Sequence, residues 1–301
     1  MTKRLIAILA ALCVLLSACG AAPVQPEATA PPSPAPTQTI EPTAEPQREA
    51  VVEDVRGSIA ELADLYGKAA ELSARYAVNV FIADTVPESL GTEVFTDRDW
   101  TDQCLDLIDA ALGCYPDGFF RAMPYAQYDR IYLYLTGTGG FAGTYWPSEN
   151  ALCIQIDANC AISGSDFFNY TLHHELFHMI DGRLHDTPSI DEKAWMSYDP
   201  EGFEYAGRDD EAQMAVYDGC YEYFVDSYGT CSAEEDRAEV FGEAMAWYQD
   251  HDRTQCSMDM PQVADKLGYL CRCMRAEFSF SDLAELPWEA ALAAANQSGS
   301  D

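Results

Sequence analysis

The sequence predicts an α+β fold, because strand-like segments occur only in its first half and helix-like segments dominate its second half. Four segments have the β-branched, alternating or short apolar pattern of strands: residues 76–83, 130–135, 141–146 and 151–156. From residue 166 onward, apolar residues recur mainly at helical spacing. We therefore expect one domain of about 245 residues, built of a small sheet and many helices.

Two helices are expected in the first half. Residues 53–74 carry apolar side chains at helical spacing, and residues 99–112 follow the candidate caps Asp97 and Asp99. The last two strands are joined by Pro147-Ser148-Glu149-Asn150, a sequence typical of a turn. These elements supply the sheet and the helices that cover it.

The second half begins with a long predicted helix. It starts near Asp166 or Asn169, and Gly182 is the expected C-cap. Residues 183–218 are acidic and rich in Tyr and Gly, which is typical of a loop. Further helices are expected at residues 233–248, 261–276 and 281–295.

The N-terminus has the pattern of an export signal. Lys3 and Arg4 precede an apolar run over residues 5–16, which is short for a membrane span. The run ends in Leu16-Ser17-Ala18-Cys19, which resembles a bacterial lipobox. The resemblance implies that residues 1–18 are a lipoprotein signal peptide and that Cys19 carries the lipid. The alternative is an ordinary signal peptide that is cleaved nearby, with Cys19 incidental.

A tether follows the predicted lipidation site. Residues 19–50 contain mostly Ala, Pro, Thr, Gln and Glu, and so have too little apolar surface to offset the entropy of ordering. The folded domain is expected at residues 51–301. We therefore expect a protein held at the outer, extracytoplasmic face of a bacterial cell membrane by its N-terminal lipid.

The charge of the chain excludes some partners. The formal net charge is −33, from 50 Asp and Glu against 17 Lys and Arg. Such a surface repels phosphate backbones and anionic lipid headgroups, so we expect no nucleic-acid partner.

The chain contains 11 Cys, of which nine remain once Cys13 and Cys19 are set aside. An exported protein can keep disulfides, but an odd count leaves at least one thiol unpaired. Cys220 and Cys231 are spaced to close a short loop. No CxxC or four-cysteine zinc pattern is present.

The most specific motif is His174-Glu175-Leu176-Phe177-His178, an HExxH pattern inside the long predicted helix. Residues four apart lie on one face of a helix, so His174 and His178 can bind one metal ion. Glu175 lies beside that metal, where it can take a proton from a zinc-activated water. The pattern therefore predicts one Zn²⁺ per chain.

A catalytic zinc needs three protein ligands and one open position. The third ligand is expected in the helix 233–248, where Glu239 and Glu243 share a face that also carries Asp236. Inward-facing carboxylates are costly unless they meet a cation. Glu235 and Asp236 are alternative ligands on this helix, and Asp181 is an alternative outside it.

Two blocks of sequence resemble the catalytic core of the anthrax lethal factor-like zinc peptidases. They are His174-Glu175-Leu176-Phe177-His178-Met179-Ile180-Asp181 and Ala238-Glu239-Val240-Phe241-Gly242-Glu243-Ala244-Met245. The sequence is also similar to bacterial lipoproteins described as zinc-binding metallopeptidases. These families are zincins, and the resemblance implies a zincin-like fold. Such a fold has an N-terminal lobe with a small, twisted mixed sheet, the HExxH helix in the middle and a helical C-terminal lobe.

The resemblance also implies roles for individual residues. The first glutamate of the family's second helix is the metal ligand, so Glu239 inherits that role, and Glu243 supports the site from behind. Either Asp181 or Glu243 would orient a ligand imidazole by accepting its second N–H.

A tyrosine is expected to stabilise the transition state. Tyr228-Gly229 matches in type a Tyr-Gly that precedes the ligand helix in the family, but Tyr228 lies several residues farther from Glu239 than the family's spacing. Tyr221 and Tyr223 therefore remain alternatives to Tyr228.

The predicted function is that of a zinc-dependent peptidase, expected to be a monomeric endopeptidase that acts on polypeptides. Amide hydrolysis in cell-wall peptide would use the same chemistry. The alternative from another class is a surface lipoprotein that binds zinc or a peptide on a zincin scaffold without turnover. The presence of Glu175 favours the enzyme, because a decayed site would usually lose this base first.

Overall fold

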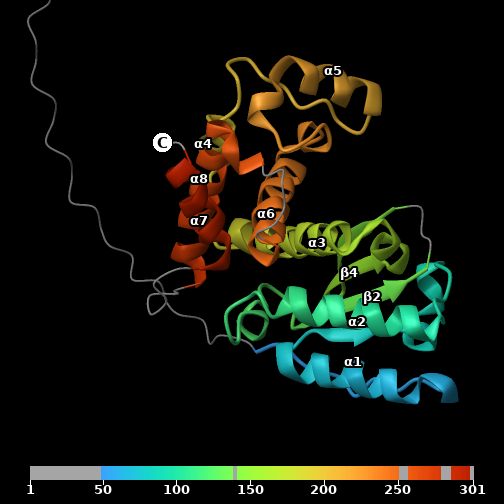
Figure 1. Ribbon diagram of the computed structural model, residues 1–301. Helices are drawn as coiled ribbons and strands as arrows, with labels where there is room; N and C mark the ends of the chain where they lie inside the picture. The colour runs from blue at the N-terminus through green and yellow to red at the C-terminus, as the bar shows by residue number, and fades with distance from the viewer. Residues whose placement is uncertain (1–48, 138–140, 251–256, 279–285, 299–301) are drawn as a thin grey trace, which may run out of the picture. The chain divides into compact units, whose positions relative to one another are not determined.

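A four-stranded mixed sheet lies in the N-terminal half of the computed structural model (Figure 1). Its strands are β1 (Asn79–Phe81), β2 (Arg130–Thr136), β3 (Gly143–Ser148) and β4 (Ala151–Asp157), in the order β1-β2-β4-β3. Strands β1, β2 and β4 are parallel, and a tight turn folds β3 back antiparallel to β4. Strand β3 therefore occupies an edge of the sheet.

The structure describes residues 49–137, 141–250, 257–278 and 286–298. All of them belong to one structural unit, Glu45–Asp301. The predicted signal peptide, Cys19 and nearly all of the predicted tether lie outside the described residues. No described helix is both long enough and apolar enough to cross a membrane.

Three helices cover one face of the sheet. They are α1 (Ala63–Tyr76), α2 (Arg98–Leu112) and α3 (Ser165–Asp186). Helix α2 lies in the crossover that parallel strands β1 and β2 require, and Asp97 caps it by accepting a hydrogen bond from Trp100 N at 2.9 Å. Alternate residues of the strands, such as Leu133 and Ile154, share one apolar core with these helices.

Helices make up the C-terminal part of the chain: α4 (Glu192–Met196), α5 (Asp210–Cys220), α6 (Ala233–Gln249), α7 (Pro261–Phe278) and α8 (Pro287–Ser298). Short 3₁₀ segments include η5 (Ala158–Ser163), η6 (Tyr221–Tyr223) and η7 (Tyr228–Thr230). Helix α3 lies between the sheet and α6, and α7 and α8 pack against α6 (Figure 1). Buried on both sides, α3 is the central element of the domain.

The predicted α+β class is confirmed, together with the small mixed sheet, the long HExxH helix and the helical C-terminal part. Some boundaries were wrong. The predicted helix 53–74 starts only at Ala60–Leu62 as a 3₁₀ turn, because the backbone N–H groups of Glu53 and Ser58 donate to the side chains of Asn79 and Asp84 instead of to a helix. The predicted loop 183–218 contains the end of α3, α4 and most of α5.

Gly182 is not the C-cap of the HExxH helix, which continues to Asp186. A Cβ atom at Gly182 would lie 2.3 Å from the hydroxyl oxygen of Tyr125. The glycine therefore admits a tyrosine side chain against the helix and does not end the helix.

The eight described cysteines are all free thiols, and Cys220 is not bonded to Cys231. Cys256 lies outside the described residues. Several of these thiols are buried, among them Cys104 and Cys160, and burial raises the pKa of Cys160 to about 11. These buried cysteines act as small apolar side chains of the core.

Close packing of α6 on α3 depends on Gly242. A Cβ atom there would lie 3.3 Å from Tyr170 O and 3.4 Å from His174 N, both on the backbone of α3. We expect Gly242→Val to lower the free energy of unfolding by about 1–3 kcal/mol, because a backbone neighbour cannot move aside. Urea unfolding measures this, with Gly219→Val as the matched control, because nothing lies within 4 Å of a Cβ at Gly219. Equal effects of the two substitutions would contradict the prediction.

Candidate metal centre

Helix α3 holds His174 and His178 on one face, one turn apart, as the HExxH spacing predicts. Their Nε2 atoms lie 3.1 Å apart. Both side chains are largely buried, and α6 packs along the same face. The two nitrogens therefore converge on one point in the cleft between α3 and α6.

Glu235, in the first turn of α6, supplies the third atom. Its Oε2 lies 3.2 Å from the Nε2 atom of His174 and 3.2 Å from that of His178. Together the three side chains form a group that could hold a metal ion. Ser232 caps α6 by accepting from Glu235 N at 3.3 Å, so the carboxylate lies at the positive end of the helix dipole.

The three atoms fit a zinc site. A tetrahedral Zn²⁺ with bonds of about 2.0–2.1 Å holds its ligand atoms about 3.3 Å apart, close to the spacing found here. Glu235 Oε2 is buried and accepts no hydrogen bond from the described residues. Two imidazoles and one glutamate are also a ligand set of catalytic zinc.

Electrostatics agree with a cation at this point. Burial lowers the pKa of His174, but Glu235 and Glu239 outweigh it and raise that pKa to about 10. Burial likewise opposes ionisation of Glu235, but contacts with the two histidines hold its pKa well below the usual range. The site therefore attracts a proton in the absence of metal, and a bound metal ion would replace that proton.

Glu239 lies one helical turn behind the point where the three atoms meet. Its Oε1 is 2.9 Å from Nδ1 of His174, and its other oxygen accepts a hydrogen bond from the hydroxyl of Tyr170. A carboxylate on the second nitrogen of a metal-binding histidine fixes the orientation of the ring. The structure thus groups Glu235, one of the predicted alternatives, with the two histidines, and places Glu239, the predicted ligand, against the other nitrogen of His174.

Glu175 faces the cleft beside the histidines, opposite Gly143 of β3. A Cβ atom at Gly143 would lie 2.7 Å from Cγ and 2.8 Å from Oε1 of Glu175, so only glycine leaves room for this side chain. Burial raises the pKa of Glu175 to about 7, partly offset by His174 and His178. A carboxyl with such a pKa can both accept and return a proton near neutral pH.

Tyr228 is the predicted tyrosine that the structure brings to the site. Its ring lies 6.1 Å from the ring of His174, and its hydroxyl interacts with Glu235. The backbone N–H groups of Tyr228 and Gly229 donate to Asp226 Oδ1, which holds the turn. Burial and the nearby Glu235 raise the pKa of Tyr228, so the phenol keeps its proton at neutral pH.

The two alternatives to Tyr228 lie elsewhere. Tyr221 and Tyr223 belong to η6, which packs against α7. Tyr221 is largely exposed. Of the three tyrosines considered from the sequence, Tyr228 is the one whose ring lies near His174 and whose hydroxyl interacts with Glu235.

Asp181 and Glu243, the residues predicted to orient an imidazole, both have other partners in this structure. Asp181 accepts two hydrogen bonds of 2.8 Å from the guanidinium of Arg237 on α6. Arg237 is fully buried and also contacts Glu192 at 3.2 Å. Glu243 accepts a hydrogen bond from Ser257 N at 3.1 Å. The carboxylate that lies against Nδ1 of His174 is that of Glu239.

His173, next to the motif, is a core residue. Its Nδ1 lies 3.0 Å from the hydroxyl of Tyr115, and its Nε2 lies 3.1 Å from Oε1 of Gln249. Burial lowers its pKa to about 4, so the ring is neutral. Its position on the helix turns it away from His174 and into the packed interior.

The cleft in front of the three atoms has a volume of about 460 Å³. Strand β3 lines one side of the cleft, and Ser232, Glu234 and Glu235 at the start of α6 line another. Arg208 also lines the cleft, with its Nη2 atom 3.9 Å from Glu235 Oε1. The sequence interpretation missed Tyr170 and Arg208. No local pattern marks them, because each is defined only by what it faces across the cleft.

The fold is similar to that of a crystal structure described as "a putative zinc-binding metallo-peptidase from Bacteroides caccae ATCC 43185". The TM-score is 0.52 at 15% sequence identity, over 81% of this chain and 95% of that chain. The sequence matches no protein-family model and no curated protein. The chain therefore shares the fold of that protein, whereas the peptidase activity and the lethal factor-like type stay predictions.

The roles of the glutamates on α6 can be separated by metal affinity. We expect Glu239→Ala to weaken zinc binding by about 10- to 100-fold, as loss of an orienting carboxylate does, and Glu235→Ala to weaken it more. Glu243→Ala is the control on the same helix face and should bind zinc normally. Competition with a chromophoric chelator measures all three. A larger loss from Glu239→Ala than from Glu235→Ala would restore Glu239 as the ligand.

The Asp181–Arg237 pair joins α3 to α6 next to the site. We expect Asp181→Ala to lower the free energy of unfolding by about 3–5 kcal/mol, because it leaves a buried guanidinium without its bidentate partner. The double variant Asp181→Leu/Arg237→Met should lose less, since no buried charge remains unpaired. Urea unfolding tests both proteins, and a double variant as unstable as the single one would contradict this explanation.

Proposed function

We propose that this protein is a zinc-dependent endopeptidase of the lethal factor-like type, held by an N-terminal lipid at the outer face of a bacterial membrane. The observation that supports it best is the convergence of His174, His178 and Glu235 within 3.2 Å of one another, with Glu175 beside them. Membrane attachment rests on the lipobox-like sequence that ends at Cys19.

Four residues would bind the zinc and orient its ligands. His174, His178 and Glu235 would hold the zinc, and Glu239 would keep the ring of His174 in position. When bound, zinc supplies a Lewis acid that activates water and polarises the scissile carbonyl.

Glu175 moves the proton. Its carboxylate takes a proton from the attacking water and delivers it to the nitrogen of the leaving amine. Burial supports this role, because a pKa of about 7 lets the group work in both directions near neutral pH.

Tyr228 stabilises the developing negative charge. Its phenol stays protonated and can donate a hydrogen bond to the oxyanion that forms at the scissile carbonyl. The hydroxyl interacts with Glu235, the glutamate of the proposed metal site.

The edge of β3 explains a preference for polypeptides. An extended peptide can add to this edge as a further strand, since β4 pairs with only one side of β3. Gly143, Thr144 and Tyr145 line the cleft in front of the histidines. Such backbone pairing recognises a chain and needs no free terminus, which favours an endopeptidase.

The test is cleavage of a diverse peptide library by the zinc-loaded protein, run beside Glu175→Gln. We expect internal cuts by the unmutated protein and a loss of at least about 100-fold in rate with Glu175→Gln, because the general base is removed. Mass spectrometry identifies the cuts. A folded protein that holds one zinc and cuts nothing would favour a lipoprotein that binds zinc or peptide without turnover.

A further inference from the structure

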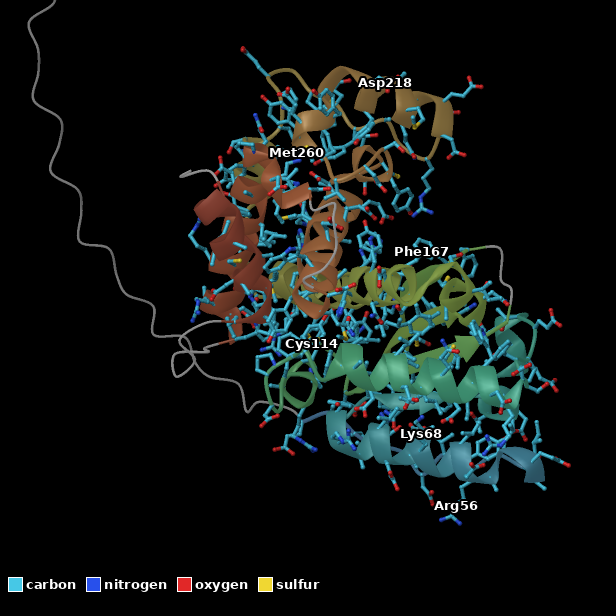
Figure 2. All side chains as sticks on the ribbon, in the orientation of Figure 1. Arg56, Lys68, Cys114, Phe167, Asp218 and Met260 are labelled. Atoms are coloured by element: carbon cyan, nitrogen blue, oxygen red, sulfur yellow. The ribbon has the colours of Figure 1, made fainter. Side chains whose placement is uncertain are left out.

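Two phenylalanine side chains that line one surface hollow are exposed. Phe141, just before β3, is 45% exposed, and Phe167, in the first turn of α3, is 43% exposed. Figure 2 labels Phe167 at the N-terminal end of α3. No other phenylalanine of the described residues is as exposed as these two. We call Phe141 and Phe167 the apolar patch.

A hollow of about 350 Å³ lies at the patch, between Phe141 and Phe167. Its polar lining is already engaged in part, since Asp157 Oδ1 accepts hydrogen bonds from the backbone and side-chain nitrogens of Asn159. No Lys or Arg is among its lining residues. A volume at the lower end of ligand pockets, with aromatic walls, suits one or two apolar side chains.

The hollow continues the active-site cleft. The cleft is lined from Gly143 onward along β3, and the hollow is lined by the two preceding residues, Phe141 and Ala142. The helix shows the same order, because Thr171 and Glu175 both face Gly143, and Thr171 lies one turn after Phe167. Strand and helix thus run together from the patch to the catalytic glutamate.

From this continuity we infer that the apolar patch binds a large apolar side chain of the polypeptide substrate, three or four residues from the scissile bond. The inference rests on the proposed function, which places an extended peptide along β3. Phe167 precedes Glu175 by eight residues, or about 12 Å along a helix. An extended peptide covers that length in three to four residues.

A protein–peptide double-mutant cycle tests the patch. The zinc-loaded full chain, unmutated or carrying Phe141→Ser/Phe167→Ser, cleaves a peptide with Phe at the inferred position and a matched peptide with Ser there. We expect the double substitution to lower kcat/KM at least about 10-fold for the Phe peptide, the scale of a lost apolar contact, and less than about twofold for the Ser peptide. Met196→Ser is the control, since Met196 on α4 is 47% exposed and lies outside the patch and the cleft.

Equal losses for the two peptides, or library cuts without an apolar preference at that distance, would overturn the inference and leave the peptidase intact. A second readout does not need turnover. Zinc-loaded Glu175→Gln captures peptides from the same library, and we expect enrichment in Phe, Leu and Ile that disappears with the two serine substitutions. If the protein cuts nothing, the proposed function fails, but the capture experiment still tests whether the patch binds apolar side chains. Enrichment that depends on Phe141 and Phe167 would support such binding. A lack of enrichment would refute it.

Discussion

The candidate site depends above all on the contact between α3 and α6. The two histidines come from one helix and Glu235 from the other, so their distances follow from how the helices cross. Gly242 lets the backbones approach within van der Waals contact, and the buried Asp181–Arg237 pair links the helices near His178. Both features are short-range and directional, which gives the crossing one defined geometry.

Several charged side chains are buried where α6 packs into the interior. Asp236 pairs with the fully buried Lys266 at 2.7 Å, and Lys266 also reaches Asp199 at 2.7 Å. Lys266 Nζ lies 4.0 Å from the centre of the ring of Phe224, which adds a cation–π contact. Glu239 has His174 and Tyr170 as partners. The carboxylate of Glu235 differs from these, because its Oε2 atom lies between two imidazoles that can themselves bind a metal ion, with Arg208 and the hydroxyl of Tyr228 as its further neighbours. That difference singles out Glu235 as the carboxylate that a cation would complete.

The sheet helps to position Glu175, the proposed general base. Hairpin β3–β4 brings an edge strand alongside α3, and Gly143 makes the space that Glu175 occupies. The same strand leads back to Phe141, so one edge connects the catalytic carboxylate with the apolar patch. A single strand can thus set both where a peptide is cut and which neighbouring residues are favoured.

The sequence by itself determined the α+β class, the long helix with its HExxH motif and the helix that carries the third carboxylate. These follow from periodicity and from residue spacing within one element, which are local properties. Only the tertiary structure decided which carboxylate meets the histidines. Glu235, Glu239 and Glu243 are spaced by four and share a helix face, so their sequence pattern is nearly the same at each turn. Which of these glutamates meets the histidines depends on the position along α6 at which it crosses α3. The contact between Asp181 and Arg237 depends on the same crossing of the two helices. Such contacts between distant segments have no signature in the spacing of residues along the chain.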